Sequence, residues 1–161
     1  MQAFAIGNSR WSRGGAAHRM LAALYCIAVS AQVVSQYAAR KMVSDIDDPR
    51  WNGMRIADDA GIIDFTSSLQ IGGEIRSIEW NVLGSQVVVV TVDRVHGSPK
   101  AFTTELFNSW RIGSEAYNNG VLVVVVKGER RVEIEPGTGL NRLLSQSWCT
   151  SMLERYVVPE F

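Results

Sequence analysis

The sequence predicts an α/β protein: a three-layer α/β/α sandwich with a short mixed sheet, preceded by an N-terminal hydrophobic helix. Residues 121–126 form an apolar run without alternation, which is typical of a strand buried on both faces of a sheet. Segments with helical spacing alternate with strand-like runs from residue 54 onward, so helical layers are expected on the sheet. A turn around Lys127-Gly128-Glu129 predicts a hairpin, which makes one strand pair antiparallel.

The N-terminal stretch, residues 1–41, combines basic residues with an apolar segment. Three arginines precede residues 20–39, an interval without charged side chains. About 20 residues suffice to span a ~30 Å hydrocarbon core as a helix, which predicts a membrane anchor with its N-terminus on the cytoplasmic, matrix or stromal side. The alternative is a secretory signal cut after Ala31.

Residues 42–53 mix acids, proline and glycine in the manner of a linker, and no fold is expected there. Residues 54–161 follow, and a stretch of roughly this length is typical of a single domain with one core. The sequence therefore predicts three parts: the anchor or signal, a linker, and one α/β domain.

The first half of the domain contains two predicted strands and a helix. An early strand and the turn after it are expected in residues 56–63, and a second strand in residues 86–92. A helix is expected from Thr66 or Ser67 to Leu83, with Gly84 as its stop. Gly72-Gly73 lies inside that helix, where each glycine costs about 1 kcal/mol relative to alanine. This pair predicts either close packing or a break in the helix.

Two further helices are predicted in the second half. Ser98 can cap the first of them and Pro99 fits its opening turn, and Gly113 supplies a stop. Its apolar face recurs every four residues, at Phe102, Leu106 and Trp110. The same spacing predicts a last helix with a core face at Leu140, Leu144, Trp148, Met152 and Tyr156.

Composition limits the classes of partner. Sixteen basic and sixteen acidic residues give a formal net charge of zero, which does not favour nucleic acid as a partner. The two cysteines, Cys26 and Cys149, show no metal-ligand spacing and cannot form a disulfide framework. We expect both to be buried free thiols.

Several ordered motifs together identify a family. They are Ile56–Ile63, Gln86–Val92, Leu106–Gly113, Asn119–Leu122 and Arg131–Leu140. In this order they resemble the TPM domain family, whose members include thylakoid-lumen proteins of photosystem II repair, bacterial envelope proteins and a nematode receptor modulator. The resemblance covers roughly residues 54–161 and implies the fold. Ser114 departs from the pattern, since many relatives have an acid there, and relatives continue into a further helix beyond Phe161, so we expect a C-terminally shortened domain in which catalysis is in doubt.

Polar side chains near strand ends suggest a cation site. We expect Asp58-Asp59, Asp93 and the Asn118-Asn119 turn to converge on the carboxyl edge of the sheet, where open α/β folds bind ligands. Carboxylate and amide oxygens suit Ca²⁺ or Mg²⁺. Some family members are described as metal-binding or as phosphatases, so the resemblance implies a divalent site formed by Asp58, Asp59, Asn118 and Asn119. The alternative interpretation is that all four are turn or capping residues.

A glycine turn and the two histidines are weaker candidates for a functional site. Gly137-Thr138-Gly139 suggests a phosphate-binding turn, but it lacks a following lysine and Pro136 removes an amide donor, so a turn entering a helix is preferred. His18 and His96 lie outside any nucleophile motif and are interpreted as juxtamembrane and loop residues.

These observations predict a non-catalytic, membrane-anchored accessory subunit of a large energy-transducing membrane complex, with the TPM-like domain as a docking module on the lumenal or intermembrane-space side. The expected partners are the membrane and other protein subunits. An arginine-rich, acid-free N-terminus fits mitochondrial or plastid targeting. The mitochondrial inner membrane is preferred over the thylakoid, and the bacterial envelope stays open. The alternative is a divalent-metal-dependent phosphatase, or an assembly or repair factor, of the TPM family.

Overall fold

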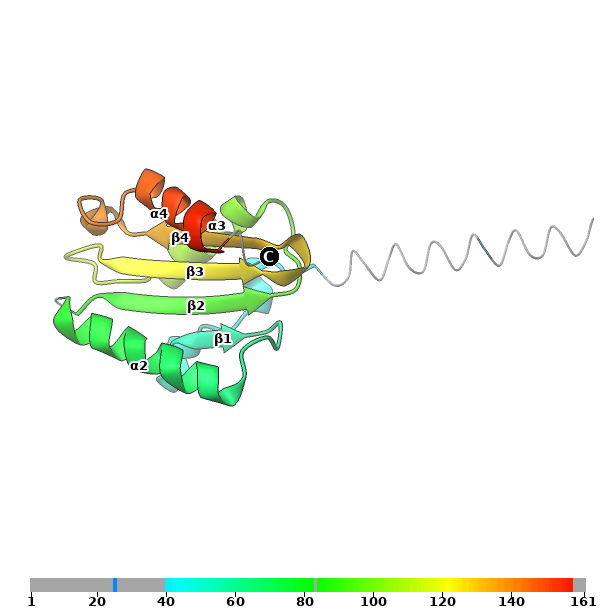
Figure 1. The fold of residues 1–161 in the computed structure, drawn as a ribbon, viewed down its shortest axis with the longest axis horizontal. Helices are drawn as coiled ribbons and strands as arrows, with labels where there is room; N and C mark the ends of the chain where they lie inside the picture. The colour runs from blue at the N-terminus through cyan, green and yellow to red at the C-terminus, as the bar shows by residue number, and fades with distance from the viewer. Residues whose placement is uncertain (1–24, 26–39, 83, 158–161) are drawn as a thin grey trace, which may run out of the picture. The chain divides into compact units, whose positions relative to one another are not determined.

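The computed structural model describes residue 25, residues 40–82 and residues 84–157 (Figure 1). The chain divides into two units, Met1–Ala38 and Ala39–Phe161, and the fold described below is that of the second unit. The predicted anchor, apart from Tyr25, lies outside the described residues. Within the described part of the chain, no helix has the length and apolarity needed to cross a membrane.

A four-stranded mixed sheet organises this unit. Its strands, in spatial as well as chain order, are β1 (Ile56–Asp58), β2 (Gln86–Val92), β3 (Gly120–Val126) and β4 (Arg131–Pro136). The first three strands are parallel, whereas β4 runs antiparallel to β3 (Figure 1). The 3-10 turn η3 (Lys127–Glu129) joins β3 to β4. The predicted mixed sheet and its hairpin are therefore confirmed.

One face of the sheet forms the main core with helix α3 (Pro99–Trp110). The strands contribute alternate residues, all fully buried: Val88, Val90, Val92, Leu122, Val124 and Val126. Phe102 and Leu106 of α3 pack against them, and the Ser98 hydroxyl accepts a hydrogen bond from the backbone N–H of Ala101 at 3.2 Å. The predicted cap and core face of this helix are confirmed.

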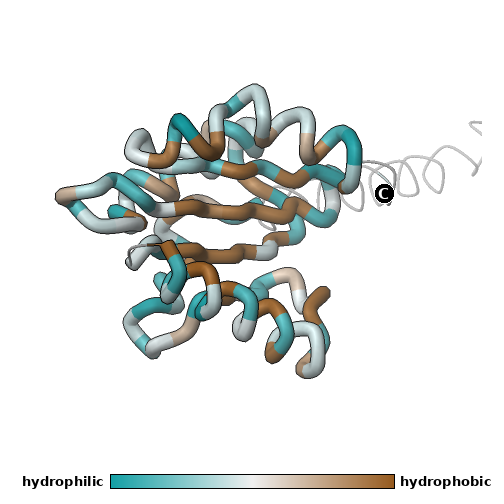
Figure 2. Tube along the Cα trace, turned by 60° about the vertical axis from the view of Figure 1, so that its left-hand side comes forward, coloured by the Kyte–Doolittle hydropathy of each residue, from teal (hydrophilic) through white to brown (hydrophobic). Residues whose placement is uncertain are grey.

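The other face is covered by two separated helices. Helix α2 (Phe65–Asn81) contacts β2, and helix α4 (Gln146–Met152) contacts β4. Between them Val121, Val123 and Val125 of β3 are only half-buried. The expectation that 121–126 is buried on both faces is wrong for this second face, because α2 contacts β2 and α4 contacts β4 rather than β3. Figure 2 shows the hydrophobic strands running between the helices.

Helix α2 begins one residue before the prediction. The Asp64 carboxylate accepts hydrogen bonds from the backbone N–H groups of Thr66 and Ser67 at 2.8 and 3.0 Å, which caps the helix. The helix runs unbroken through Gly72 and Gly73, and a Cβ added at either would meet nothing within 4 Å. Neither predicted reason for the glycine pair, a break or close packing, is present within this unit.

The last helix presents a different face from the predicted one. Cys149 is fully buried, whereas Trp148 and Tyr156 are 45% and 59% exposed. The prediction assumed one continuous helix, but a 3-10 turn η4 (Thr138–Leu140) ends before α4 starts, and a π-turn η5 (Leu153–Val157) follows α4. The spacing counted from Leu140 therefore does not stay on one face. Cys149 is a buried free thiol, as predicted, whereas Cys26 lies outside the described residues.

The predicted linker is folded onto the domain. Lys41 forms a parallel bridge with Val95, and the 3-10 turns η1 (Val43–Asp45) and η2 (Pro49–Asn52) follow. Ile46 between them is 7% exposed and belongs to the main core. Residues 42–53 are therefore not a free linker, because one apolar side chain of this polar segment fills the space beside α3.

Candidate functional site

Asp58 ends β1 and holds the loop that leads to α2. One carboxylate oxygen accepts a hydrogen bond from the backbone N–H of Ile62 at 3.1 Å, and the other accepts from that of Ile63 at 3.0 Å. The hydroxyl of Thr91, on the neighbouring strand, also donates to this carboxylate. Burial alone would raise the pKa of Asp58, but the Thr91 and backbone hydrogen bonds outweigh it and lower that pKa. The ionised carboxylate therefore fixes the loop.

Asp59 and Asp93 lie at the same edge of the sheet as Asp58. The Lys41 ammonium contacts an Asp59 carboxylate oxygen at 2.9 Å, and this hydrogen bond raises the pKa of Lys41. Asp93 follows β2, and its backbone carbonyl accepts from the N–H of Gly128 at 2.7 Å. This edge gathers three acids from two parallel strands, as predicted.

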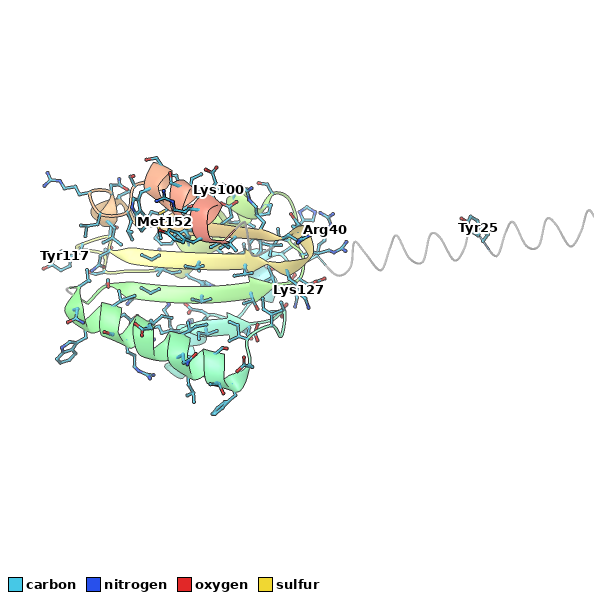
Figure 3. The ribbon with its side chains drawn as sticks, in the orientation of Figure 1. Tyr25, Arg40, Lys100, Tyr117, Lys127 and Met152 are labelled. Carbon is cyan, nitrogen blue, oxygen red and sulfur yellow. The ribbon has the colours of Figure 1, made fainter. Side chains whose placement is uncertain are left out.

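The asparagine pair lies at the opposite edge. Asp58 is in register with Thr91 and Val125, whereas Asn119 immediately precedes Gly120, which pairs with Gln86. Five residue steps along β3 separate the two ends, about 17 Å at 3.3 Å per residue. Figure 3 shows Tyr117, beside the asparagines, at the other end of the sheet from Lys127.

The expected convergence of the asparagine pair with the acids is therefore wrong. In parallel strands, residues that precede one strand and residues that follow another lie at opposite edges, so Asn118 and Asn119 cannot share a cation with Asp58 and Asp59. Among the residues that the structure describes, no group of three or more His, Cys, Asp or Glu side chains is placed to hold a metal ion. The four predicted ligands do not fit one Ca²⁺ or Mg²⁺ site.

Each asparagine shapes the turn before β3. Asn119 is 6% exposed, and its side-chain oxygen accepts from the backbone N–H of Ser114 at 2.9 Å. Asn118 has a φ of 45°, in the left-handed region that asparagine tolerates better than most residues. These contacts match the alternative interpretation of the pair as turn residues.

Four glycines bring three backbone segments together at this edge. This glycine junction consists of Gly113, Gly120, Gly137 and Gly139. A Cβ on Gly120 would overlap the carbonyl of Ile112, and one on Gly139 would overlap the carbonyl of Tyr117. The junction needs glycine because backbone atoms of neighbouring segments occupy the space of a side chain.

The same junction explains the Gly137-Thr138-Gly139 turn. The N–H of Gly137 donates to the carbonyl of Gly120 at 2.8 Å, and the N–H of Gly139 donates to that of Asn118 at 3.0 Å. Both glycine amides are thus engaged by the chain itself, rather than pointing at an anion. The turn enters the short helix η4, in agreement with the preferred interpretation.

Arg50 is a hub that the sequence did not reveal. Its guanidinium makes a bidentate ion pair with Asp48, with one contact at 2.6 Å, and donates to the side-chain oxygen of Gln86 at 2.7 Å. It also donates to the carbonyl of Trp110, at the C-terminus of α3. Burial would raise the pKa of Asp48, but the hydrogen bonds from Arg50 outweigh it and lower that pKa. The side-chain partner Gln86 and the carbonyl of Trp110 are 36 and 60 residues away in sequence, so no local motif marks the hub.

Comparison with known proteins defines the relationship of this domain. The chain matches the family model of the TPM domain over residues 56–161. Its fold is similar to the N-terminal domain of a Porphyromonas gingivalis protein solved by NMR, with 27% identity and a TM-score of 0.68 over 76% of this chain and 79% of that one. The N-terminal domain of a Corynebacterium glutamicum protein gives 17% identity and a TM-score of 0.46, over 66% and 78% of the two chains.

No curated protein matches the sequence. The family match nevertheless covers most of the chain, and it includes both the Asp58 loop and the glycine junction. The chain belongs to the TPM domain family.

Proposed function

We propose that this chain is a non-catalytic accessory subunit of a large energy-transducing membrane complex, in which the TPM domain is the docking module. One observation supports the proposal: the polar side chains singled out above bind other parts of their own chain, whereas large apolar side chains are exposed. Asp58, Asn119 and Arg50 are engaged in holding loops and a helix end of their own chain. Large apolar side chains, by contrast, are exposed: Trp51 is 89% and Trp80 is 88% accessible. Exposed aromatic side chains of this size favour a protein-binding surface.

The location follows from the N-terminal sequence. Residues 20–39 would anchor the chain, and the preceding arginines would keep the N-terminus on the matrix, stromal or cytoplasmic side. The TPM domain would then face the intermembrane space or lumen. The N-terminus is rich in arginine and free of acids, which suits targeting to mitochondria or plastids, and of these two we favour the mitochondrial inner membrane. The partners would be lipid and other protein subunits, and the zero net charge gives no support to nucleic acid.

The test is extraction in a gentle detergent, followed by a native gel and mass spectrometry of the bands. A subunit is expected to comigrate with a large membrane complex and to retain peptides upstream of Ala31. Gln32→Leu and Ala31→Leu, which alter polar and small positions of the anchor, are expected to weaken this comigration. A small soluble species beginning at Gln32, or full retention in both variants, would contradict the proposal.

The second candidate is a divalent-metal-dependent phosphatase, and it rests on the family match together with Asp58 and Asp59 at the carboxyl end of β1. Such an enzyme would hydrolyse p-nitrophenyl phosphate only with added Ca²⁺ or Mg²⁺. Asp58→Asn would abolish that activity, whereas Asp64→Asn, at the cap of α2, would retain it because asparagine also caps helices. Metal-dependent hydrolysis with this pattern would replace the docking proposal. An assembly or repair factor would instead comigrate with the complex only while the complex is being built.

A further inference from the structure

Helix α2 presents a stripe of side chains to solvent that the fold does not use. The α2 stripe consists of Phe65, Leu69, Gly72, Gly73, Arg76 and Trp80. Successive members are mostly three or four residues apart, so they follow one side of the helix. Phe65 is 79% exposed, Leu69 57% and Trp80 88%. An apolar side of this kind is unusual on a helix that already packs on a sheet.

The core-facing side of α2 is different. Ile75 is the buried residue of this helix, and at 100° per residue it projects about 110° around the helix from the middle of the stripe. The ion pair between Arg55 and Glu79, at 2.7 Å, ties the helix to the start of β1. The domain therefore holds α2 without the stripe. The two glycines have open space where a Cβ would stand, so a neighbouring backbone can approach closely there.

We infer that the α2 stripe is the interface of a homodimer in which two copies of α2 pack antiparallel about a two-fold axis. The basis is that the stripe is self-complementary. Residues equally distant from the Gly72–Gly73 peptide bond form three pairs: Phe65 with Trp80, Leu69 with Arg76, and Gly72 with Gly73. A two-fold axis through that bond places Phe65 of one copy on Trp80 of the other. Leu69 meets the aliphatic stem of Arg76, and glycine meets glycine at the crossing.

This arrangement puts each large side chain against a suitable partner. Phenylalanine and tryptophan form favourable edge-to-face or offset pairs, and the glycines let the helices approach closely enough for those pairs to form. Isologous interfaces require a patch that complements itself, which an unrelated partner helix would not require. The inference goes beyond the proposed function and does not depend on it.

The contact area sets the expected strength. Buried aromatic side chains contribute roughly 150–250 Å² each, so two copies of the stripe would bury on the order of 800–1,000 Å² in total. This lies below the roughly 1,200–2,000 Å² of stable specific interfaces and within the range of weak, transient ones. The dimer is therefore a weak one, whose population rises with protein concentration over about the micromolar range.

Sedimentation velocity of the full chain in mild detergent, over a concentration series, tests the inference. The wild type is expected to shift from monomer to dimer as concentration rises. Trp80→Ala removes an aromatic contact at each end of the interface and is expected to raise the dimer dissociation constant at least about tenfold. Trp51→Ala is the matched control, since Trp51 is 89% exposed but lies outside α2, and it is expected to leave the constant unchanged.

Disulfide trapping separates this interface from association through residues 20–39. In a Cys26→Ala background, Gly72→Cys is expected to give a linked dimer under mild oxidation. Glu74→Cys, exposed and about 160° around α2 from Gly72, is expected to stay monomeric. The inference requires both results. A chain that stays monomeric, a dimer that Trp80→Ala does not weaken, or equal linking through both cysteines would overturn it.

Discussion

At the scale of single residues, the glycine junction shows how little space the domain leaves between its backbone segments. A side chain at Gly139 would occupy the position of the Tyr117 carbonyl oxygen, and one at Gly137 would overlap the carbonyl of Asn118. The turn before β3 and the turn before η4 therefore fix each other. The Gly137-Thr138-Gly139 turn resembles a phosphate-binding turn in the sequence, but in the structure its glycines allow close packing of neighbouring backbone segments.

This predicts opposite effects for two glycine-to-alanine changes. Gly139→Ala is expected to lower the free energy of unfolding by at least about 2 kcal/mol, because backbone must move to admit the methyl group. Gly73→Ala meets nothing within 4 Å in a helix interior and is expected to raise it by about 1 kcal/mol. Urea unfolding followed by circular dichroism, in dilute protein, measures both. Equal effects at the two sites would contradict the close approach described for the junction.

Two carboxylates also have structural roles at the scale of single residues. Asp58 and Asp48 are each held ionised by donors of their own chain, Asp58 by two backbone amides and the Thr91 hydroxyl, and Asp48 by Arg50. In both cases the lowered pKa reports hydrogen bonding that exceeds the cost of burial. A lowered pKa here is evidence of a structural role as much as of a reactive one.

At the scale of elements, the segment before β1 is part of the domain. It contributes Ile46 to the core, the bridge from Lys41 to Val95, and the Arg50 hub that reaches the end of α3. The donors of Arg50 meet backbone carbonyls at a helix C-terminus, where a positive charge is favourable. Residues 40–53 therefore stabilise α3 from outside the predicted domain boundary.

The corresponding prediction concerns two large side chains of this segment. Ile46→Ala is expected to cost about 2–4 kcal/mol of stability, because it leaves a cavity in the main core. Trp51→Ala, which truncates a larger but 89% exposed side chain five residues later, is expected to change stability by less than about 0.5 kcal/mol. Chemical denaturation of the full-length variants provides the comparison. If Ile46→Ala were as mild as Trp51→Ala, the segment would be a linker after all.

At the scale of the whole molecule, the shifted groups define how stability depends on pH. The folded pKa values of Asp48, Asp58 and Asp64 are lowered, so each contributes stability that is present above the unfolded value of about 4 and is lost as pH falls through the folded value. Lys41 and Cys149 have raised pKa values, Lys41 through its hydrogen bond to Asp59 and Cys149 through burial. Their contributions are present below the unfolded values of about 10.4 and 8.5 and are lost as pH rises through the folded values.

We therefore expect a broad stability plateau between about pH 5 and 8, with losses on both sides. The acid loss is expected to be the larger, because three carboxylates contribute to it and Lys41 is partly exposed. Urea midpoints measured across pH would show the plateau, and Asp48→Asn would flatten the acid limb. A midpoint that stays constant down to pH 3 would show that these carboxylates gain nothing from folding.

The sequence by itself determined the features that depend on local pattern. These include β2, the cap and core face of α3, the hairpin at η3, the buried Cys149 and the family. Each depends on residues close together in the chain, whose periodicity or turn chemistry is sufficient. Local spacing also predicted a last helix, and α4 is present. It predicted the wrong buried face for this helix, because spacing does not show at which residue a helix begins after a series of turns.

Only the tertiary structure decided which groups meet. The direction of β3 relative to β1 separates Asn119 from Asp58 by the length of the sheet, and no property of either residue encodes that direction. The Arg50 hub and the glycine junction likewise join segments that are far apart in sequence. Periodicity predicts single helices and strands. Contacts between them depend on the order and direction of the strands in the sheet, which long-range packing selects from arrangements that local sequence does not distinguish.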